Sequence, residues 1–422
     1  MTFFYDMVFF LFALVSLPKA IRRRFANPEY KGMLKRRLFT GKIQWKNDCP
    51  KVWLNGVSVG EVISLGPLVK EYESKFPGIR LYITATTGTG FHRIRNLYPN
   101  HMAAGMPLDF SWLVKRRIKK VNPDIIVSVE LDLWPNFLTA CGRMKVPFCV
   151  VSGRISESSC RGYGKIQVLL SEPFSAISLF LGQDKVDADR AMEIGIPKER
   201  VEVGGNLKFD LLNTEKSDLE GPLKELALEP NKVLVLASTH RPEESWLLEA
   251  LGRIDFKEQS EWKLVLAARH PERQEELEVL LEEKGWGCCL YSSWMEGRNW
   301  EQGEVLLIDR LGVLSKLYAL ADLAFIGGSL IPHGGQNMIE AAAVGCPVVY
   351  GPHVFNFREA HALLVESEGS FVISGKEDLE EQFTTLLENG ELRVACADRA
   401  RRAVCSRQGV ARRNFDILSK FH

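Results

Sequence analysis

The segment LAFIGGSLIPHGGQNMIEAAAVGCPVVYGP, residues 323–352, contains two short apolar runs separated by a glycine-rich loop and a helical pattern. The first run lies at 323–329 and the second at 346–352, and the helical pattern extends from Asn337 to about residue 344. Short apolar runs of this kind, closed by glycine or serine, are typical of buried parallel strands. The segment therefore predicts a strand–helix–strand unit with a glycine loop at the carboxyl end of its first strand.

The same alternation recurs from residue 51 onward and is interrupted once, by a polar stretch around Gly221-Pro222. We therefore expect an α/β protein with a GT-B-like layout, in which two doubly wound, Rossmann-like domains face a cleft. The expected domains span 21–212 and 231–422, with a linker at 213–230, and the final helix is a candidate to pack back on the N-terminal domain. The remaining apolar runs lie at 51–58, 79–86, 124–130, 147–153, 176–182, 201–206, 232–238, 262–268 and 305–309.

Composition and charge narrow the class of protein. The chain is 46% hydrophobic and 25% charged, a composition that excludes a disordered protein and a polytopic membrane protein. Its 422 residues are too many for a single hydrophobic core. Nine basic residues and one acid between Lys19 and Lys42 give that segment a charge of +8 within a chain of net charge +1. One basic block on an acidic body argues against nucleic-acid binding and for a local anionic partner. The nine cysteines show no paired spacing, so we expect neither disulfides nor a zinc site.

The N-terminus has the pattern of a membrane anchor. Residues 3–17, FFYDMVFFLFALVSL, are apolar except for Asp6 and are followed by Pro18 and the basic block. Positive charge after the apolar run argues against a signal peptide and places the following domains on the cytoplasmic side. We therefore expect a single anchor at 1–20 and a basic segment on an anionic lipid surface. The alternative is a buried helix of a soluble domain, since fifteen residues are fewer than the roughly 20 that span a bilayer comfortably.

A second basic cluster occupies residues 115–120 and follows an apolar tripeptide that starts at Trp112. Taken alone, the cluster predicts a solvated helix face. Together with the basic block at 19–42, it would contribute to one membrane-facing surface.

The loop after the first expected strand contains a carboxylate with two interpretations. Gly56 and Gly60 permit a tight turn, and Glu61 opens the helix that follows. A carboxylate in the first turn favours a structural role as partner of the helix dipole. The same position at the edge of a cleft suits a general base. The residues alone leave both interpretations open.

The other strand ends favour an anionic ligand. At the glycine loop, Asn337 and Glu340 have the spacing of a capping box, but exposed N–H groups at a helix start also suit a phosphate. Arg269 follows the apolar run at 262–268, and Lys208 follows the run at 201–206. A cation at a strand end is placed to contact an anion, although such residues are otherwise usually surface residues.

Several enzyme classes are disfavoured because their motifs are absent. The sequence contains no GxxxxGK[ST], and no GxGxxG follows the first strand. Asp187 and Asp189 lie in a helical pattern on which acids face water. We therefore expect no metal site and no cofactor.

Five segments in order resemble one family, the 3-deoxy-D-manno-octulosonic acid (Kdo) transferases of lipopolysaccharide synthesis. They are VSVGE near residue 60, GNLKFD at 205–210, ASTHRPEE at 237–244, RHPER at 269–273 and the stretch 321–357. The resemblance covers nearly the whole chain. It implies a GT-B fold and an inverting, metal-independent transfer of one or more Kdo residues. The implied donor is CMP-Kdo and the acceptor is a lipid A precursor (lipid IVA) at the cytoplasmic side of the bacterial inner membrane.

The resemblance also implies roles for particular residues. The family's catalytic carboxylate falls on Glu61, the general base, and its transition-state-stabilising residues fall on Glu130 and Lys208. Glu130 has no evident role from the residues alone, because a carboxylate beside an anionic donor is unfavourable unless it is paired. The implied donor contacts are Arg269, His270, Leu311, Gly312, Val313, Asn337, Met338, Ile339 and Glu340, and no metal ligand is implied.

This chain departs from the family pattern at Val313, where an acid is expected. If the family's acid there helps to bind the donor ribose, the contact in this chain is either made by the backbone alone or lost. Two other functions share the two-domain architecture: a nucleotide-sugar 2-epimerase, which needs neither an anchor nor a basic block, and a membrane-tethered sugar-nucleotide binding protein.

Overall fold

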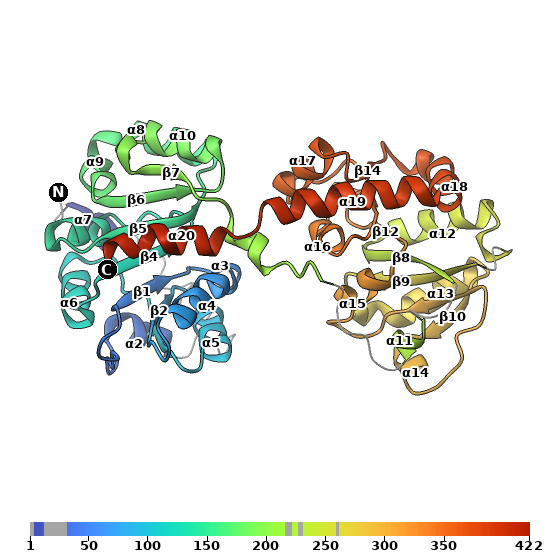
Figure 1. Cartoon of the computed structure of the whole chain (residues 1–422), viewed down its shortest axis with the longest axis horizontal. Coiled ribbons are helices and arrows are strands. Elements are labelled where there is room, and N and C mark those ends of the chain that lie inside the picture. The colour runs from blue at the N-terminus through green and yellow to red at the C-terminus, as the bar shows by residue number, and fades with distance from the viewer. Residues whose placement is uncertain (1–3, 12–31, 216–221, 227–230, 259–260) are drawn as a thin grey trace. The chain divides into compact units, whose positions relative to one another are not determined.

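The computed structural model describes residues 4–11, 32–215, 222–226, 231–258 and 261–422. The chain forms two compact units (Figure 1): unit 1 comprises 1–211 and 407–422, and unit 2 comprises 212–406. Residues 407–422 thus belong to unit 1, whereas the sequence-based division placed the end of the C-terminal domain at 422. Part of the expected linker lies outside the described residues, and a cleft between the units stays a prediction.

Unit 1 is built on a seven-stranded parallel sheet. Its strand order is β3-β2-β1-β4-β5-β6-β7. Strands β2 and β3 are added on one side of β1, and β4 to β7 are added on its other side. All six apolar runs predicted in this half contain one of these strands. The strands are β1 (Val52–Asn55), β2 (Tyr82–Ala85), β3 (Met102–Gly105), β4 (Ile125–Val129), β5 (Phe148–Gly153), β6 (Ile177–Gly182) and β7 (Val201–Val203).

Unit 2 repeats this design with the order β10-β11-β9-β8-β12-β13-β14, again all parallel. The strand–helix–strand segment at 323–352 forms β12, α16 and β13, as predicted, although α16 is shorter than expected. The strands are β8 (Lys232–Thr239), β9 (Trp262–Ala268), β10 (Gly287–Leu290), β11 (Glu304–Leu307), β12 (Leu323–Ile326), β13 (Val348–Tyr350) and β14 (Phe371–Val372).

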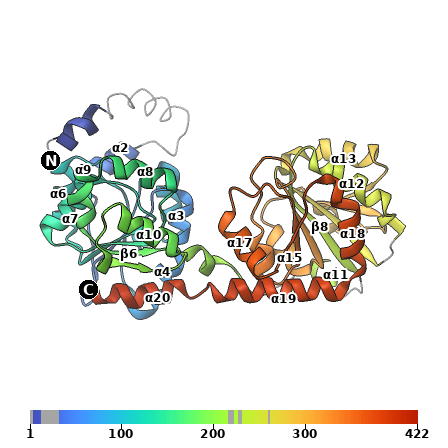
Figure 2. The same ribbon diagram turned by 90° about the horizontal axis from the view of Figure 1, so that it is seen from above.

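Helices cover both faces of each sheet (Figure 2). The helices of unit 1 are α2 (Met33–Leu38), α3 (Val59–Ser64), α4 (Gly66–Lys75), α5 (Gly88–Leu97), α6 (Ser111–Val121), α7 (Pro135–Met144), α8 (Glu157–Lys165), α9 (Gln167–Ser175), α10 (Lys185–Glu193), the short 3₁₀ turn η3 (Leu207–Leu211) and α20 (Val410–Leu418). Those of unit 2 are α11 (Pro222–Leu226), α12 (Glu243–Arg253), α13 (Gln274–Glu283), α14 (Tyr291–Met295), α15 (Leu314–Leu320), α16 (Ile339–Ala343), α17 (Arg358–Glu366), α18 (Leu379–Glu388) and α19 (Gly390–Ser406).

The strands of unit 1 are buried on both faces, which explains their continuous apolar runs. On β1, Val52 and Leu54 enter a core formed with α3, α4, α5 and α20. Trp53 points to the opposite face and packs edge-on against Tyr82 and Phe137. This alternation is the two-residue period of a strand, and it places apolar side chains in two cores at once.

Helix α20 joins unit 1 through the GNLKFD segment. The Asp210 carboxylate accepts hydrogen bonds from the backbone N–H groups of Val410 (3.2 Å) and Ala411 (2.6 Å) and so caps α20. Phe415 packs against Tyr72 of α4, with ring centroids 4.9 Å apart. The last residues of the chain therefore support the loop that carries Lys208.

The basic cluster at 115–120 is not one solvated face, because Arg117 is 1% exposed. Its guanidinium donates to the backbone carbonyls of Gly105 (3.0 Å), Arg36 (3.1 Å) and Arg37 (3.1 Å). The two Nη groups of this buried guanidinium are bonded in this way, which makes its burial tolerable. The exposed Lys115, by contrast, fits the predicted solvated face.

The expected N-terminal anchor is not supported in the part of the chain that the structure describes. Residues 4–11 form a short helix, and no described helix is long and apolar enough to cross a membrane. Asp6, the one charge in this helix, accepts hydrogen bonds from the Ser111 N–H (2.7 Å), the Ser111 hydroxyl (2.6 Å) and the Asn136 amide (3.0 Å). The helix is thus bound to the ends of α6 and α7, and the rest of the predicted anchor lies outside the described residues.

Candidate functional site

In each unit some of the polar residues of interest lie where the strand order reverses, whereas Lys208 follows the edge strand β7 and Arg269 and His270 follow β9. In unit 1 this switch point lies between β1 and β4; Glu61 follows β1 and Glu130 follows β4 directly. In unit 2 it lies between β8 and β12; His240 follows β8, and the glycine loop follows β12. Ligands of open α/β sheets bind outside the carboxyl ends of the strands at such points. Each unit therefore presents one candidate site.

Glu61 is fixed by the local structure of the α3 N-terminus. The Ser58 hydroxyl donates to Glu61 Oε1 (2.7 Å), and the Val57 N–H donates to Oε2 (2.7 Å). In return, Ser58 Oγ accepts from the Glu61 N–H (3.3 Å). Gly56 makes this packing feasible, because a Cβ there would lie 2.9 Å from the Val62 nitrogen. The carboxylate is thus part of the helix cap, while each of its oxygens keeps a second lone pair for another donor.

Glu130 and Lys208, which are far apart in sequence, meet in the structure. Lys208 Nζ lies 3.2 Å from Glu130 Oε1. Glu130 has a φ of 56°, a left-handed conformation that is rare for a residue with a Cβ, and its N–H is bonded to the Val151 carbonyl (3.0 Å). The pairing supplies the partner that a carboxylate beside an anionic ligand requires.

Asp132 adds a third carboxylate that was not among the predicted site residues. Burial, together with the charges of Glu61 and Glu130, raises its pKa to about 6. Asp132 therefore lies close enough to both predicted acids to feel their charge. Its sequence context, LDLWP, has no motif that would have indicated this, because the interaction depends on the register of two separate strands.

In unit 2 a buried carboxylate shapes the glycine loop. Glu243 is fully buried and accepts hydrogen bonds from the backbone N–H groups of His240 (3.0 Å), Gly328 (2.6 Å), Ser329 (3.0 Å) and Leu330 (2.9 Å). Burial raises its pKa, and the four hydrogen bonds oppose that shift. Four donors on one carboxylate hold the end of β8 and the loop after β12 together.

Close packing explains why this loop requires glycine. A Cβ on Gly327 would lie 2.5 Å from the Ser238 carbonyl oxygen, and one on Gly334 would lie 2.2 Å from the Asn356 amide. Gly328 and Gly334 also have φ values of 66° and 102°. Tight packing therefore accounts for these glycines whether or not the loop binds a phosphate.

Three histidines from separate segments gather beside the loop. The His240 ring lies 4.1 Å from that of His333 and 5.8 Å from that of His270, measured between centroids. Gln336 lies within hydrogen-bonding distance of His240, with 3.0 Å between the two Nε2 atoms. Burial, together with the neighbouring His333 and His270 and the charges of Arg273 and Arg269, lowers the pKa of His240 to about 4. His240 is thus neutral near pH 7, and only His270 among the three histidines was a predicted contact.

The predicted donor contacts divide into side-chain and backbone positions. Arg269 and His270 are exposed at the end of β9, and Leu311 is exposed in the turn before α15. The Asn337 amide donates to Glu340 Oε1 (2.8 Å), and its Oδ1 accepts from the Ile339 N–H (3.3 Å). The side chains of Val313, Met338 and Ile339 are buried, so these residues have only backbone groups to offer a ligand.

Arg273, in the RHPER segment, is paired with acidic side chains of its own unit. It donates to Glu244 (2.9 Å) and to Glu276 (2.6 Å), and Arg241 also pairs with Glu276. These arginines lower the pKa of Glu276 to about 2. The cation of this segment that remains for a ligand is Arg269.

The sequence matches one family over nearly its whole length. A family model described as 3-Deoxy-D-manno-octulosonic-acid transferase (kdotransferase) matches residues 22–211. The 3-deoxy-D-manno-octulosonic acid transferase of Haemophilus influenzae is 32% identical over 379 residues, covering 88% of each chain. That of Chlamydia trachomatis is 30% identical over 420 residues, covering 98% of this chain and 96% of the relative. That of Bordetella pertussis is 31% identical and covers 87% and 86%.

Solved structures with the same fold are more distant in sequence. The UDP-GlcNAc 2-epimerase of Neisseria meningitidis has a TM-score of 0.58 at 15% identity and covers 88% of this chain and 99% of its own. MurG of Acinetobacter baumannii has a TM-score of 0.55 at 15% identity and covers 88% and 100%. These likenesses show the fold alone, two GT-B-like parallel-sheet α/β domains, so they do not favour the epimerase alternative. The sequence identities of 30% or more over nearly the whole chain do distinguish the candidate functions. They show that the chain belongs to the Kdo transferase family of glycosyltransferases.

Proposed function

We propose that this chain transfers Kdo, with inversion and without a metal, from CMP-Kdo to a hydroxyl of a lipid A precursor, with Glu61 as the general base. One observation carries the proposal. A carboxylate that accepts hydrogen bonds from two local donors lies after β1, and a carboxylate–ammonium pair lies at the end of the neighbouring strand β4. Such a site holds a base in a set orientation and has a cation next to it.

The chemistry assigned to unit 1 is a displacement. Glu61 accepts the proton of the acceptor hydroxyl as that oxygen attacks the anomeric carbon of Kdo, and CMP leaves from the opposite face with the bonding electron pair. General-base assistance of this kind contributes about 10²–10⁴-fold. The Lys208 ammonium stabilises negative charge on the donor, and Glu130 orients that ammonium.

The donor nucleotide is assigned to unit 2. The Arg269 guanidinium supplies a charge-assisted contact to the phosphate, and the His270 ring contacts the groups beside it. Backbone groups of Gly312, Val313 and residues 337–340 supply the others, with the Glu340 carboxylate beside them. Because Val313 has no acid to offer, the donor ribose is bound through the backbone at this position.

An anionic lipid surface is the remaining proposed partner. The helix at residues 4–11 exposes about half of each of several large apolar side chains, and Trp112 on the adjoining α6 is 58% exposed. Lys115 and Lys119 lie on α6 as well and are exposed. Apolar side chains beside lysines favour a helix that lies in the bilayer interface. We therefore place the enzyme at the cytoplasmic face of the inner membrane, where its acceptor is inserted.

A pair of variants separates the two roles of Glu61. If the carboxylate is a base, E61Q loses about 10²–10⁴-fold in turnover while CMP binding is retained. Ser58→Ala removes the cap acceptor and one of the two donors that orient the carboxylate, but it keeps the carboxylate; it lowers the free energy of unfolding by about 1 kcal/mol and reduces turnover far less than E61Q does. If E61Q and S58A instead have equal, small effects on turnover, Glu61 is only a cap. The chain would then be better described as a binding protein or would use another base.

A further inference from the structure

Two adjacent residues near the end of β5 bond to the backbone on both sides of the Glu130–Lys208 pair. The Val151 carbonyl accepts the Glu130 N–H (3.0 Å) at the end of β4. The Ser152 hydroxyl accepts the Leu207 N–H (2.9 Å) in the GNLKFD turn, in which Lys208 is the next residue. Strand β5 is the neighbour of β4 in the sheet. One short stretch of β5 therefore holds both segments that carry the ion pair, and neither of its residues was a predicted site residue.

A bulge in β5 directs the Ser152 side chain toward this turn. Between Val150 and Gly153 the register with β6 shifts, so that two residues of β5 lie opposite one residue of β6. Ser152 has a φ of 50°, a left-handed conformation that is rare for a residue with a Cβ. Bulges re-aim side chains and are frequent next to active sites. The strained backbone therefore has a consequence for the site, since it aims the hydroxyl at the Leu207 N–H.

The contact between Ser152 and Leu207 is buried. Ser152 is 2% exposed and Leu207 is fully buried. If the hydroxyl is removed, water has little access to the Leu207 N–H, and an unpaired buried N–H drives the backbone to move toward another acceptor. The Ser152 carbonyl is also bonded, because it accepts from the Gln183 amide (3.1 Å). The hydroxyl is thus held at a well-bonded strand end, and it fixes the first residue of η3.

The position of the Lys208 ammonium depends on the backbone of the turn. The Lys208 side chain is 48% exposed, so packing does not hold it. The Lys208 N–H is bonded to Asn206 Oδ1 (3.0 Å) within the turn. Because Leu207 directly precedes Lys208, a shift of the Leu207 backbone displaces the ammonium relative to Glu130. A misplacement of about 1 Å in a site of this kind costs up to about 10²-fold in rate.

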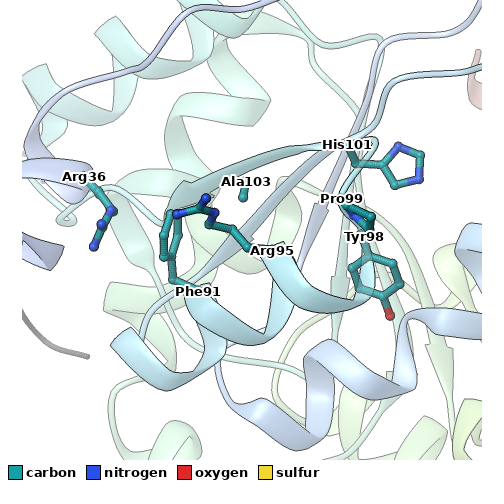
Figure 3. A pocket seen from close by; sticks show the side chains of 7 residues that line it. All are labelled: Arg36, Phe91, Arg95, Tyr98, Pro99, His101 and Ala103. Atoms are coloured by element: carbon teal, nitrogen blue, oxygen red, sulfur yellow. The ribbon is translucent and has the colours of Figure 1, made fainter. Parts of the chain in front are cut away.

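The pocket beside α5 lies away from these contacts. It has a volume of about 430 Å³, and Phe91 and Arg95 of α5 line it beside the edge strand β3 (Figure 3). Strand β3 is at one edge of the sheet, whereas β5 and β7 lie in the other half. Among the described residues, the pocket lining includes neither Ser152 nor any residue of the GNLKFD turn. A change at Ser152 is thus expected to leave that pocket unaltered.

We propose that Ser152 is a positioning residue of the transfer reaction and acts through Leu207 and Lys208, an inference that rests on the proposed function. Its hydroxyl oxygen sets the backbone of the GNLKFD turn so that the Lys208 ammonium lies beside Glu130 and faces the donor. Because it is buried, Ser152 contacts neither substrate itself. Its loss therefore changes the rate of the reaction and not the affinity for either substrate.

The first test measures the placement of Lys208 without any substrate. The full-length chain in detergent is labelled with a trace of acetic anhydride, and acetylation of Lys208 is read by mass relative to that of the exposed Lys70. E130Q gives the rate for an unpaired Lys208, up to about fivefold above wild type. We expect S152A and S152G to show most of this rise. Glycine adopts a positive φ freely, so S152G separates the loss of the hydroxyl from strain in the bulge. A wild-type rate in both variants overturns the proposal.

Ser178 provides the matched control. Its hydroxyl accepts the Phe148 N–H (3.3 Å) at the other end of β5, so it makes the same kind of contact away from the ion pair. S178A is expected to retain the wild-type Lys208 labelling rate and the wild-type kcat. A labelling rate that rises equally in S178A and S152A would reflect a general loosening of unit 1, and it overturns the proposal.

The second test is a double-variant cycle in the transfer assay. We expect S152A and S152G to lower kcat about tenfold and to leave the KM for both substrates within about twofold of wild type. In the K208M background the same changes lower kcat no further, because Ser152 acts through Lys208. A serine that only stabilises the fold would lower kcat by the same factor in both backgrounds, and that result overturns the proposal.

The labelling and transfer assays keep this inference separate from the proposed function. If wild type forms no Kdo product while Lys208 labelling still responds to S152A, the proposed transfer fails and the placement of Lys208 by Ser152 remains. If wild type forms product and S152A retains kcat, the positioning role fails and the transfer remains. Far-UV circular dichroism and thermal unfolding confirm that each variant is folded, and S152G replaces S152A in both tests if S152A does not fold.

Discussion

The ammonium nitrogen of Lys208 lies 3.2 Å from Oε1 of Glu130, which joins the GNLKFD turn to the end of β4. Lys208 is 48% exposed in its side chain and Glu130 27%. An ion pair this exposed contributes less than about 1 kcal/mol to stability. The left-handed backbone of Glu130 is therefore better explained by the orientation of the pair than by the stability of the fold.

Removing either member of this pair lowers turnover far more than stability. We expect E130Q and K208M each to reduce kcat by about 10²-fold or more and the free energy of unfolding by less than about 1 kcal/mol. The double variant is expected to be no worse than K208M, because Glu130 acts through Lys208. Glu71 and Arg412 form a pair of the same length, 3.2 Å, in the same unit, so E71Q is the control and retains kcat. Additive losses in the double variant would contradict a shared role.

Glu243 is expected to be essential for the shape of the donor loop. In E243Q one carboxylate oxygen becomes an amide NH2 group, which cannot accept hydrogen bonds from the backbone N–H groups that face it. We therefore expect the variant to lower the free energy of unfolding by about 3 kcal/mol. The Michaelis constant for the donor rises as the loop loosens. Glu249 on the same helix is 40% exposed in its side chain and pairs with Lys284, so E249Q loses less than about 1 kcal/mol. Chemical denaturation of the two variants compares them directly, and equal losses would contradict this role.

His240 makes unit 2 less stable as the pH falls. Its folded pKa of about 4 is below the ordinary value of 6.5, so the unfolded chain takes up the proton first. The resulting loss begins near pH 6.5 and is complete near pH 4, and it amounts to on the order of 2 kcal/mol. His240→Asn removes this contribution, so the stability difference between wild type and H240N changes with pH in that window. A difference that is constant from pH 7 to pH 4 would show that His240 is not shifted.

Asp132, unlike His240, makes the folded chain less stable as the pH rises. Its folded pKa of about 6 is above the ordinary 3.8, so the folded chain binds the proton more tightly and stability falls as the pH rises from about 4 to about 6. At pH 7 the penalty is at most about 3 kcal/mol, and D132N removes it. The variant is therefore expected to be more stable than wild type at pH 7 and no more stable at pH 4, as measured by urea unfolding at the two pH values. The reverse order would place Asp132 in a favourable ion pair.

The apolar runs predicted the strands of the sheets well, except at the edges. The run at 124–130 became the central strand β4 because it is buried on both faces. The edge strand β3, by contrast, reads MAAG and is only partly buried, so its composition has no strong strand signal. The same applies to β14, which has two residues, one of them exposed. Helix α16 begins two residues later than predicted because Asn337 bonds the Ile339 N–H from outside the helix.

For the candidate sites, the sequence indicated which residues take part but not which residues they contact. Glu61, Glu130 and Lys208 were each predicted, yet the 3.2 Å pairing of Glu130 with Lys208 connects segments 78 residues apart. The role of Glu243 was not predicted, since a Glu after Arg241-Pro242 reads as an ordinary first-turn acid. Arg117 was read as part of a solvated face because five basic residues surround one apolar position, and only the tertiary structure shows that its guanidinium is buried.

The measurement that tests the central claim most directly is a transfer assay with the wild-type chain. CMP-Kdo generated in situ and a tetraacylated lipid A precursor are incubated with the enzyme in detergent and EDTA, and the lipid products are read by mass. The proposed function predicts products heavier by one or more Kdo units, formed in the presence of the chelator and lost in E61Q. A folded protein that binds CMP but forms no Kdo-bearing lipid would contradict it.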